Sequence, residues 1–210
     1  MTGHSKNIVT AGVTLKAAKQ VLIMLHGRGA NAEDIISLSR YLKLQDTHII
    51  APQATNNAWY PYSFLAPRRQ NEPWLSSALQ LLGEILQDLF AAGFKSHQVF
   101  ILGFSQGACL ALEFATRNAQ LFGGIIAFTG GLIGDVLQEE SYTGDFQKAK
   151  VFIGNSNKDP HVPVTRSEES KIIMEKLSAE VTLKIYPGMA HTVVDDELNW
   201  VNENIFSVKR

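Results

Sequence analysis

The sequence predicts an α/β fold in which helices cover both faces of one mostly parallel β-sheet. Apolar runs of strand length alternate with helical patterns from one end of the chain to the other. Runs such as Val21–Leu25 and Gly124–Phe128 are almost continuously hydrophobic, as strands covered on both faces are. The chain has 210 residues and 45% hydrophobic residues, and no repeat or low-complexity linker divides it. We therefore expect a single domain that spans residues 1–210.

Each expected strand is a run of β-branched, aromatic or aliphatic residues that a turn signal ends. The expected strands cover residues 8–15 (at the sheet edge), 21–25, 48–51, 98–102, 124–128, 150–154 and 181–186.

The expected helices have start or stop signals at their ends. They cover residues 32–42, 74–92, 108–115 and 165–178, and a last one begins at 195. Asn31 is a suitable N-cap for the first of them, and Pro73 suits the first helical position of the second. Gly93 is a typical stop for that second helix, and acidic residues 195–197 favour the start of the last one.

Residues 52–73 form a long segment rich in asparagine, proline and aromatic residues, with no clear period. A loop of this length in a compact domain is usually functional or disordered, and the aromatic residues argue against disorder. Two interpretations of Trp59, Tyr60 and Phe64 remain open: they line an apolar substrate wall, or they pack the loop onto the core. Arg68 and Arg69 are expected to be solvated, and residues 132–147 form a second irregular segment.

The motif Gly103-Phe104-Ser105-Gln106-Gly107 lies between an expected strand and an expected helix. A G-x-S-x-G sequence in that context is typical of a nucleophile elbow, a sharp turn that presents a reactive serine. Its two glycines leave room for neighbouring chain to approach closely. We therefore predict that Ser105 is a nucleophile.

Polar or glycine-rich turns follow several of the expected strands, and these turns supply the other groups that a serine nucleophile needs. Strand ends of a parallel sheet lie along one edge, so Ser105, Asp159 and His191 should converge there. His191 would act as the base and Asp159 would orient its imidazole. His161 is a rival base, but its nearness to Asp159 in sequence makes it a neighbour of the site instead.

Acyl transfer through a serine also needs donors for the oxyanion of the tetrahedral intermediate. The backbone N–H of Gln106, which follows the nucleophile, is one expected donor. The turn of residues 26–29 should supply the second, from the N–H of Arg28. His26 in the same turn is expected to brace the loop.

Five motifs together resemble the phospholipase/carboxylesterase family of small α/β-hydrolases, which includes acyl-protein thioesterases and bacterial carboxylesterases. The matching segments are 25–30 (LHGRGA), 103–108 (GFSQGA), 129–132 (TGGL), 159–163 (DPHVP) and 188–191 (GMAH). The resemblance covers nearly the whole chain. It implies an α/β-hydrolase fold without a large cap domain, and a serine esterase with no metal and no cofactor. It also implies short to medium acyl esters, thioesters or lysophospholipids as substrates.

Two residues depart from the family pattern. Arg28 stands where many members carry leucine, so a cation changes the wall of the acyl site. Ser156 stands where a glycine is expected three residues before the acid, which affects the shape of that turn.

The composition argues against several other classes of function. The formal net charge of −1 implies no basic face, so nucleic acid is not an expected partner. The single cysteine, Cys109, excludes an intrachain disulfide, and we expect it to be a buried structural thiol. We see neither a signal peptide nor a run long enough to span a bilayer, so a cytoplasmic protein is expected. A homodimer is left open.

Three alternative functions are considered. A serine peptidase or a carbon–carbon-bond hydrolase on the same fold usually carries a larger cap or a second domain. A non-catalytic binding module would not need Ser105, Asp159 and His191 together. A metallohydrolase that uses Asp159, His161 and His191 matches no known metal-ligand spacing.

Overall fold

The computed structural model describes residues 3–207 and contains one seven-stranded sheet. The strands are β1 (Ile8–Gly12), β2 (Gln20–Leu25), β3 (Thr47–Pro52), β4 (Val99–Phe104), β5 (Gly124–Phe128), β6 (Lys150–Ser156) and β7 (Glu180–Tyr186). Their order in the sheet is β1-β3-β2-β4-β5-β6-β7. Only β1 is antiparallel to its neighbour, β3, and the other pairs are parallel. The predicted fold class is confirmed.

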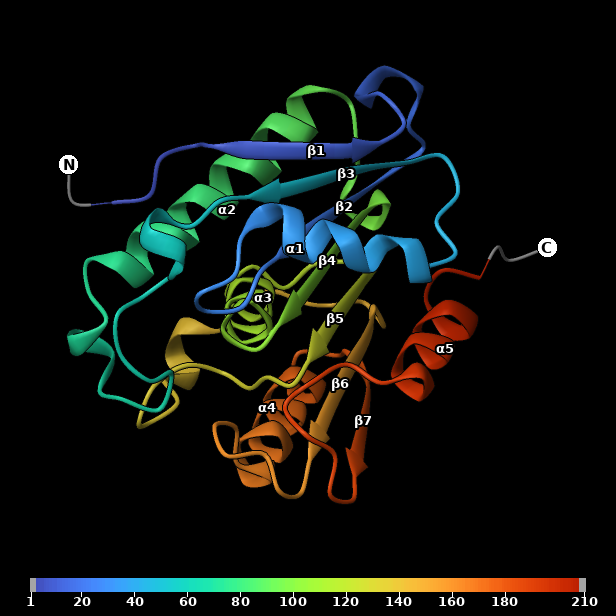
Figure 1. Cartoon of the computed structure of the whole chain (residues 1–210). Coiled ribbons are helices and arrows are strands. Elements are labelled where there is room, and N and C mark those ends of the chain that lie inside the picture. Colours follow the sequence, from blue (N-terminus) through green and yellow to red (C-terminus); the bar gives the residue numbers. More distant parts are fainter. Residues whose placement is uncertain (1–2, 208–210) are drawn as a thin grey trace.

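Helices cover the two faces of this sheet (Figure 1). They are α1 (Ala32–Ser37), α2 (Trp74–Ala91), α3 (Gln106–Arg117), α4 (Val164–Lys176) and α5 (Asp195–Asn204). Alternate residues of the strands point to opposite faces, so each face has its own core. Leu22 and Met24 of β2 pack in a cluster with α1 and α5, whereas Val21 and Ile23 join the cluster of α2, α3 and α4.

Several predicted boundaries need correction. The edge strand ends at Gly12, not Leu15, because Gly12 has φ +75° and turns the chain. The first helix is α-helical only to Ser37 and continues as a 3₁₀ turn over Leu38–Tyr41. Pro73 is the N-cap of α2, so Trp74 takes the first helical position. The capping role of Asn31 is confirmed, since its side chain accepts from the Asp34 N–H in a capping box.

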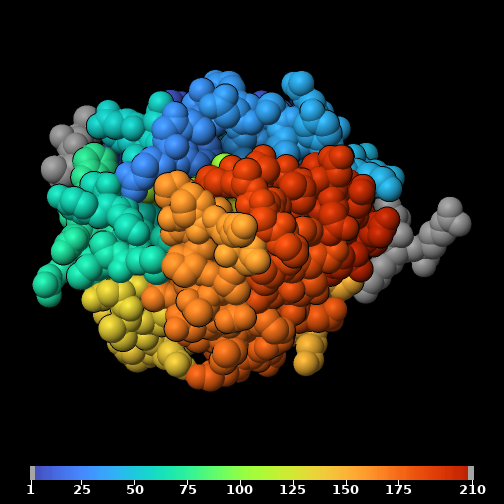
Figure 2. Space-filling model, turned by 60° about the horizontal axis from the view of Figure 1, so that its bottom comes forward, coloured from blue at the N-terminus to red at the C-terminus, as the bar shows by residue number. Residues whose placement is uncertain are grey.

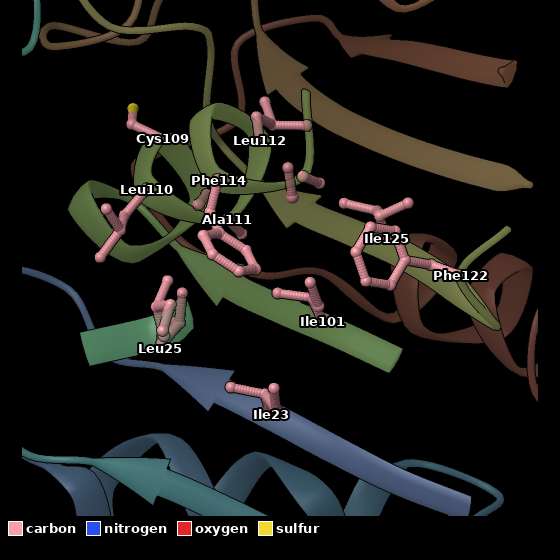
Figure 3. Packing of buried hydrophobic residues seen from close by; sticks show 14 of the residues in the cluster. Ile23, Leu25, Ile101, Cys109, Leu110, Ala111, Leu112, Phe114, Phe122 and Ile125 are labelled. Atoms are coloured by element: carbon pink, nitrogen blue, oxygen red, sulfur yellow. The ribbon is translucent and has the colours of Figure 1, made fainter. Parts of the chain in front are cut away.

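Helix α3 is buried along nearly its whole length. Its residues from Gln106 to Thr116 are all buried, and Figure 3 shows its side chains packed on strands β2, β4 and β5. Phe114 and Leu110 extend from the helix towards this sheet face, where Ile23, Ile101 and Ile125 complete the cluster. The helix therefore holds a fixed position relative to the strand ends.

The part of the chain that the structure describes contains no large cap domain. Its longest connections without a strand or an α-helix cover residues 53–73 and 129–149. Both follow the carboxyl end of a strand, β3 and β5 respectively, and so lie at the edge where the predicted site residues gather.

Candidate active site

Ser105 occupies the turn between β4 and α3 in a backbone conformation that few non-glycine residues adopt. Its φ is +54° and its ψ is −118°, and its N–H donates to the Phe128 carbonyl at 3.0 Å. Such strained serines occur at functional sites, where the surrounding structure enforces them. A Cβ on Gly103 would collide with the Gly107–Ala108 backbone, and a Cβ on Gly107 would collide with the end of β2. The two glycines therefore allow the close packing that holds the turn.

His191 lies between Ser105 and Asp159 and contacts both. Its Nε2 is 2.8 Å from Ser105 Oγ, and its Nδ1 is 2.7 Å from Asp159 Oδ2. With Nδ1–H donating to the carboxylate, Nε2 is left to accept from the serine hydroxyl. The geometry is that of a nucleophile, a base and an orienting acid in hydrogen-bond contact.

The Asp159 carboxylate is fully buried and has further donors. Its Oδ1 accepts hydrogen bonds from the N–H groups of His161 and Val162, each at 2.8 Å. Burial on its own would raise the pKa of Asp159, but the hydrogen bonds from His191 and from these two N–H groups outweigh it and lower the pKa below its ordinary value. The carboxylate stays ionised and keeps the imidazole oriented.

The turn that carries Asp159 tolerates Ser156 in place of glycine. The Ser156 carbonyl accepts from the Asp159 N–H at 3.3 Å, and its hydroxyl accepts from the Lys158 N–H at 3.2 Å. Asn157 Oδ1 accepts from the N–H of Gly188, in the loop that carries His191. The turn that carries Asp159 and the loop that carries His191 are thus joined by a direct hydrogen bond.

The two predicted oxyanion donors are backbone N–H groups on either side of the serine. Gln106 is the first residue of α3, at the positive end of the helix dipole. Within residues 3–207, neither its N–H nor that of Arg28 donates a hydrogen bond. A Cβ on Gly27 would lie 3.5 Å from Ser105 Cβ, so the turn of residues 26–29 adjoins Ser105. Both N–H groups are available for a ligand.

A cavity of about 710 Å³ opens beside Ser105 and His191. It is lined by the ends of several segments, which adjoin on the face shown in Figure 2 as blue, teal, orange and red atoms. Tyr60, Phe64 and His161 all line it, as do Arg28 and Gln106.

Trp59 does not line this cavity, so its assignment to the substrate wall needs correction. The side chain is fully buried beneath the loop, and its indole N–H donates to the His26 carbonyl at 2.9 Å. Its ring also packs against the His26 ring, with centroids 5.0 Å apart. An indole satisfied in this way supports the loop from behind.

His26 braces the turn of residues 26–29, as its position predicts. Its Nδ1–H donates to the Gly27 carbonyl at 2.8 Å, and its Nε2 accepts from the Ala54 N–H at 3.1 Å. Burial lowers the pKa of His26, which favours the neutral ring that these two bonds require.

Sequence reasoning missed the side-chain roles of Gln106 and Arg28. Gln106 Oε1 accepts from the Trp59 N–H and its Nε2 donates to the Tyr60 carbonyl, both at 2.9 Å. The Arg28 guanidinium donates to three successive carbonyls of the aromatic loop, those of residues 60, 61 and 62. No local pattern indicates these contacts, since they depend on where a long loop returns in space.

A buried charge network was also missed. Glu113 on α3 is fully buried and accepts from Arg68 at 2.8 Å and from Arg117 at 2.7 Å. Tyr142 and the Ile133 N–H bind its other oxygen. Arg68 is therefore not merely solvated: it ties the aromatic loop to α3, and Glu113 ties the second irregular segment to the same point. The sequence does contain a sign of this network, because Glu113 is a charged residue within an apolar helical stretch.

Two negative findings apply to the described residues. No group of three or more histidine, cysteine, aspartate or glutamate side chains there could hold a metal ion. None of the helices in the same part combines the length and apolar character needed to cross a bilayer.

The sequence profile of the phospholipase/carboxylesterase family matches residues 9–208. The chain belongs to the phospholipase/carboxylesterase family. It is therefore an esterase-type hydrolase with an α/β-hydrolase fold.

Three similar proteins illustrate the membership in this family. The crystal structure of a phospholipase/carboxylesterase from Dyadobacter fermentans is 54% identical, with a TM-score of 0.97 over 99% of each chain. The structure of esterase PE8 is 26% identical, with a TM-score of 0.80 over 94% of this chain and 96% of that one. Acyl-protein thioesterase 1 of Saccharomyces cerevisiae is 28% identical over 91% of this chain and 94% of its own length.

Proposed function

We propose that the protein is a serine carboxylesterase or thioesterase that works through an acyl-enzyme on Ser105. The observation that carries the proposal is the position of His191, which lies within hydrogen-bond distance of both Ser105 Oγ and Asp159 Oδ2. A serine hydroxyl is a weak nucleophile until an adjacent base accepts its proton. His191 is in contact with that hydroxyl before any substrate binds.

In the first half of the reaction, Ser105 Oγ attacks the acyl carbon while His191 Nε2 takes the hydroxyl proton. The negative charge that forms on the carbonyl oxygen is stabilised by the N–H groups of Gln106 and Arg28. Removal of one donor of this kind typically costs about 100- to 1,000-fold in turnover. His191 then returns the proton to the leaving alcohol or thiol, and the acyl group stays on Ser105.

In the second half, water replaces the leaving group. His191 takes a proton from water, the hydroxide attacks the acyl-enzyme, and the proton returns to Ser105 Oγ as the carboxylic acid departs. Asp159 remains ionised throughout and stabilises the imidazolium that forms twice in each cycle. The lowered pKa of Asp159 supports this role.

The substrate is proposed to be a small ester, thioester or lysophospholipid with a short to medium acyl chain. The cavity of about 710 Å³ lies within the range of small-molecule sites. Phe64 and Tyr60 supply apolar wall, and the names of the relatives as esterase and acyl-protein thioesterase support the substrate class. We also propose that residues 1–210 act as one domain.

A fluorophosphonate probe and two nitrophenyl esters test the proposal. The native protein should take up one probe per chain, and peptide mass spectrometry should place it on Ser105. Hydrolysis of p-nitrophenyl acetate and butyrate should be lost in Ser105→Ala, by a factor near 10⁶ in kcat as serine hydrolases show. A wild-type rate in Ser105→Ala would refute the proposed nucleophile, and a protein that reacts with neither probe nor ester would instead be a binding module.

A further inference from the structure

We propose that the Arg28 side chain is a positioning residue that fixes the substrate wall to the oxyanion hole and so sets acyl selectivity. The inference rests on the proposed esterase function and deepens it, because it names the group that determines which acyl chains fit. It concerns the side chain of Arg28, whereas the oxyanion role concerns only its backbone N–H.

The Arg28 guanidinium forms a three-point contact with the loop. Its Nη1 donates to the Pro61 carbonyl at 2.8 Å, and its Nη2 donates to those of Tyr60 and Tyr62 at 2.8 and 2.7 Å. A planar guanidinium has fixed donor directions and can serve several oxygens at once, which an ammonium group cannot do in the same way. The three carbonyls thus have one defined arrangement around Arg28.

Among the described residues, two of these three carbonyls have no other hydrogen-bond donor. In the part of the chain that the structure describes, the carbonyls of Pro61 and Tyr62 accept from no group other than Arg28. Proline has no N–H, so Pro61 cannot hold the loop by donating. Without the guanidinium, these carbonyls would turn to water, and residues 61 and 62 would lose their direct link to the turn of residues 26–29. The links from that turn to residues 54, 57 and 59 would remain.

Gln106 holds the same loop from the opposite side of the nucleophile. Its side-chain amide binds the Trp59 N–H and the Tyr60 carbonyl. The Tyr60 carbonyl therefore accepts from both Gln106 and Arg28. The two residues whose backbone N–H groups form the proposed oxyanion hole are also the residues whose side chains hold the wall.

Because Arg28 and Gln106 take part through both backbone and side chain, the position of the wall is linked to that of the proposed oxyanion hole. Tyr60 and Phe64 line the cavity, and their positions are set by bonds to residues that adjoin Ser105. The wall that contacts the acyl chain and the N–H groups that bind the oxyanion then keep a fixed position relative to each other. A loop released from Arg28 would still be attached through Gln106 at residues 59–60, through Asn71 at residues 62–63 and through the Gly134 N–H at Phe64. The movement would therefore centre on Pro61 and on the peptide carbonyls that Arg28 binds.

A rival interpretation gives Arg28 a role through its charge alone, by stabilising the oxyanion or attracting an anionic substrate. The two roles respond differently to Arg28→Lys. Lysine keeps the charge but not the planar fork, so it preserves an electrostatic role and loses the three-carbonyl contact.

The experiment compares Arg28→Leu, Arg28→Lys and the control Arg40→Leu, which removes an exposed arginine of the Leu38–Tyr41 turn. The readouts are kcat and KM on p-nitrophenyl acetate, butyrate and octanoate, and backbone hydrogen exchange over residues 59–64. Both Arg28 variants should speed exchange there. Both should change the octanoate-to-acetate ratio of kcat/KM by about tenfold, because a displaced wall alters contacts with the longer octanoyl chain, and loss of contact with about two methylene groups is worth that factor. The control should match the wild type.

Two results would overturn the inference. If Arg28→Leu keeps the wild-type hydrogen exchange and the wild-type chain-length preference, the Arg28 guanidinium does not position the loop. Wild-type kinetics in Arg28→Lys alongside a defective Arg28→Leu would assign the effect to charge. Failure of the proposed function is separate, since it appears as absent hydrolysis by the wild type, and hydrogen exchange then still tests whether Arg28 holds the loop.

Discussion

The close approach between Gly107 and the end of β2 allows a quantitative prediction about how the fold positions the proposed oxyanion hole. In Gly107→Ala, the new Cβ would lie 2.6 Å from the His26 carbonyl oxygen and closer still to that of Leu25. Ordinary contact begins at about 3.4 Å, so the start of α3 and the end of β2 must separate by about 0.8 Å or more. That movement carries the N–H of Gln106 away from the turn that holds Arg28.

The expected cost appears mainly in kcat. Misplacement of a catalytic geometry by 1 Å costs about 100-fold, and the loss of one oxyanion donor costs about 100- to 1,000-fold. We therefore expect kcat in Gly107→Ala to fall by about 100-fold. Overpacking should also lower the free energy of unfolding by about 1–3 kcal/mol.

The assay is steady-state hydrolysis of p-nitrophenyl butyrate together with urea unfolding. The matched control is Gly83→Ala within α2, where an added Cβ meets nothing within 4 Å. Alanine should stabilise that helix by about 0.5–1 kcal/mol and leave kcat unchanged. A folded Gly107→Ala variant that keeps kcat within about threefold of wild type would refute the reasoning.

Three further predictions follow from buried groups. Asp159→Asn should lower kcat by about 10⁴-fold with little loss of stability, as measured by ester kinetics and urea unfolding, because the imidazole loses its oriented tautomer. Burial raises the pKa of Glu197 from 4.5 to about 7, so the stability present below pH 4.5 should decline by up to about 3 kcal/mol as pH rises to 7. Urea unfolding at pH 4.5, 6 and 8 should show this decline in the wild type but not in Glu197→Gln, and equal slopes would contradict it. Burial also raises the pKa of Cys109 to about 12, so iodoacetamide should label it only in the unfolded protein, as mass spectrometry would show.

Periodicity and turn chemistry were sufficient to predict the order and type of the main elements. Strands such as Val21–Leu25 are continuous apolar runs, which only a sheet covered on both faces explains. The ends of elements were harder to predict, because tertiary contacts decide them. The α-helix that begins at Ala32 changes to a 3₁₀ turn after Ser37, although its sequence remains compatible with a helix to Leu42.

The proximity of Ser105, Asp159 and His191 was predictable because each residue follows a strand, and parallel strand ends meet at one edge. The structure brings all three into contact. The sequence could not decide between the two interpretations of Trp59, because an aromatic residue in a loop has an apolar face that suits a cavity or a core equally well. Only the path of the loop decides which side it faces, and here the indole turns inward to the His26 carbonyl.

The side chains that hold the substrate wall share a property that hides them from sequence patterns. Arg28 and Gln106 bind mainly to backbone carbonyls and to one N–H, groups that every residue carries whatever its side chain. No complementary residue type therefore marks their partners. Substitution of Tyr60 or Tyr62 should leave the Arg28 contact in place, whereas substitution of Arg28 removes it entirely. If the proposed role of Arg28 holds, the side chains of the loop can vary while Arg28 keeps the loop backbone in place relative to Ser105. Both the side chains and that backbone position would then contribute to chain preference.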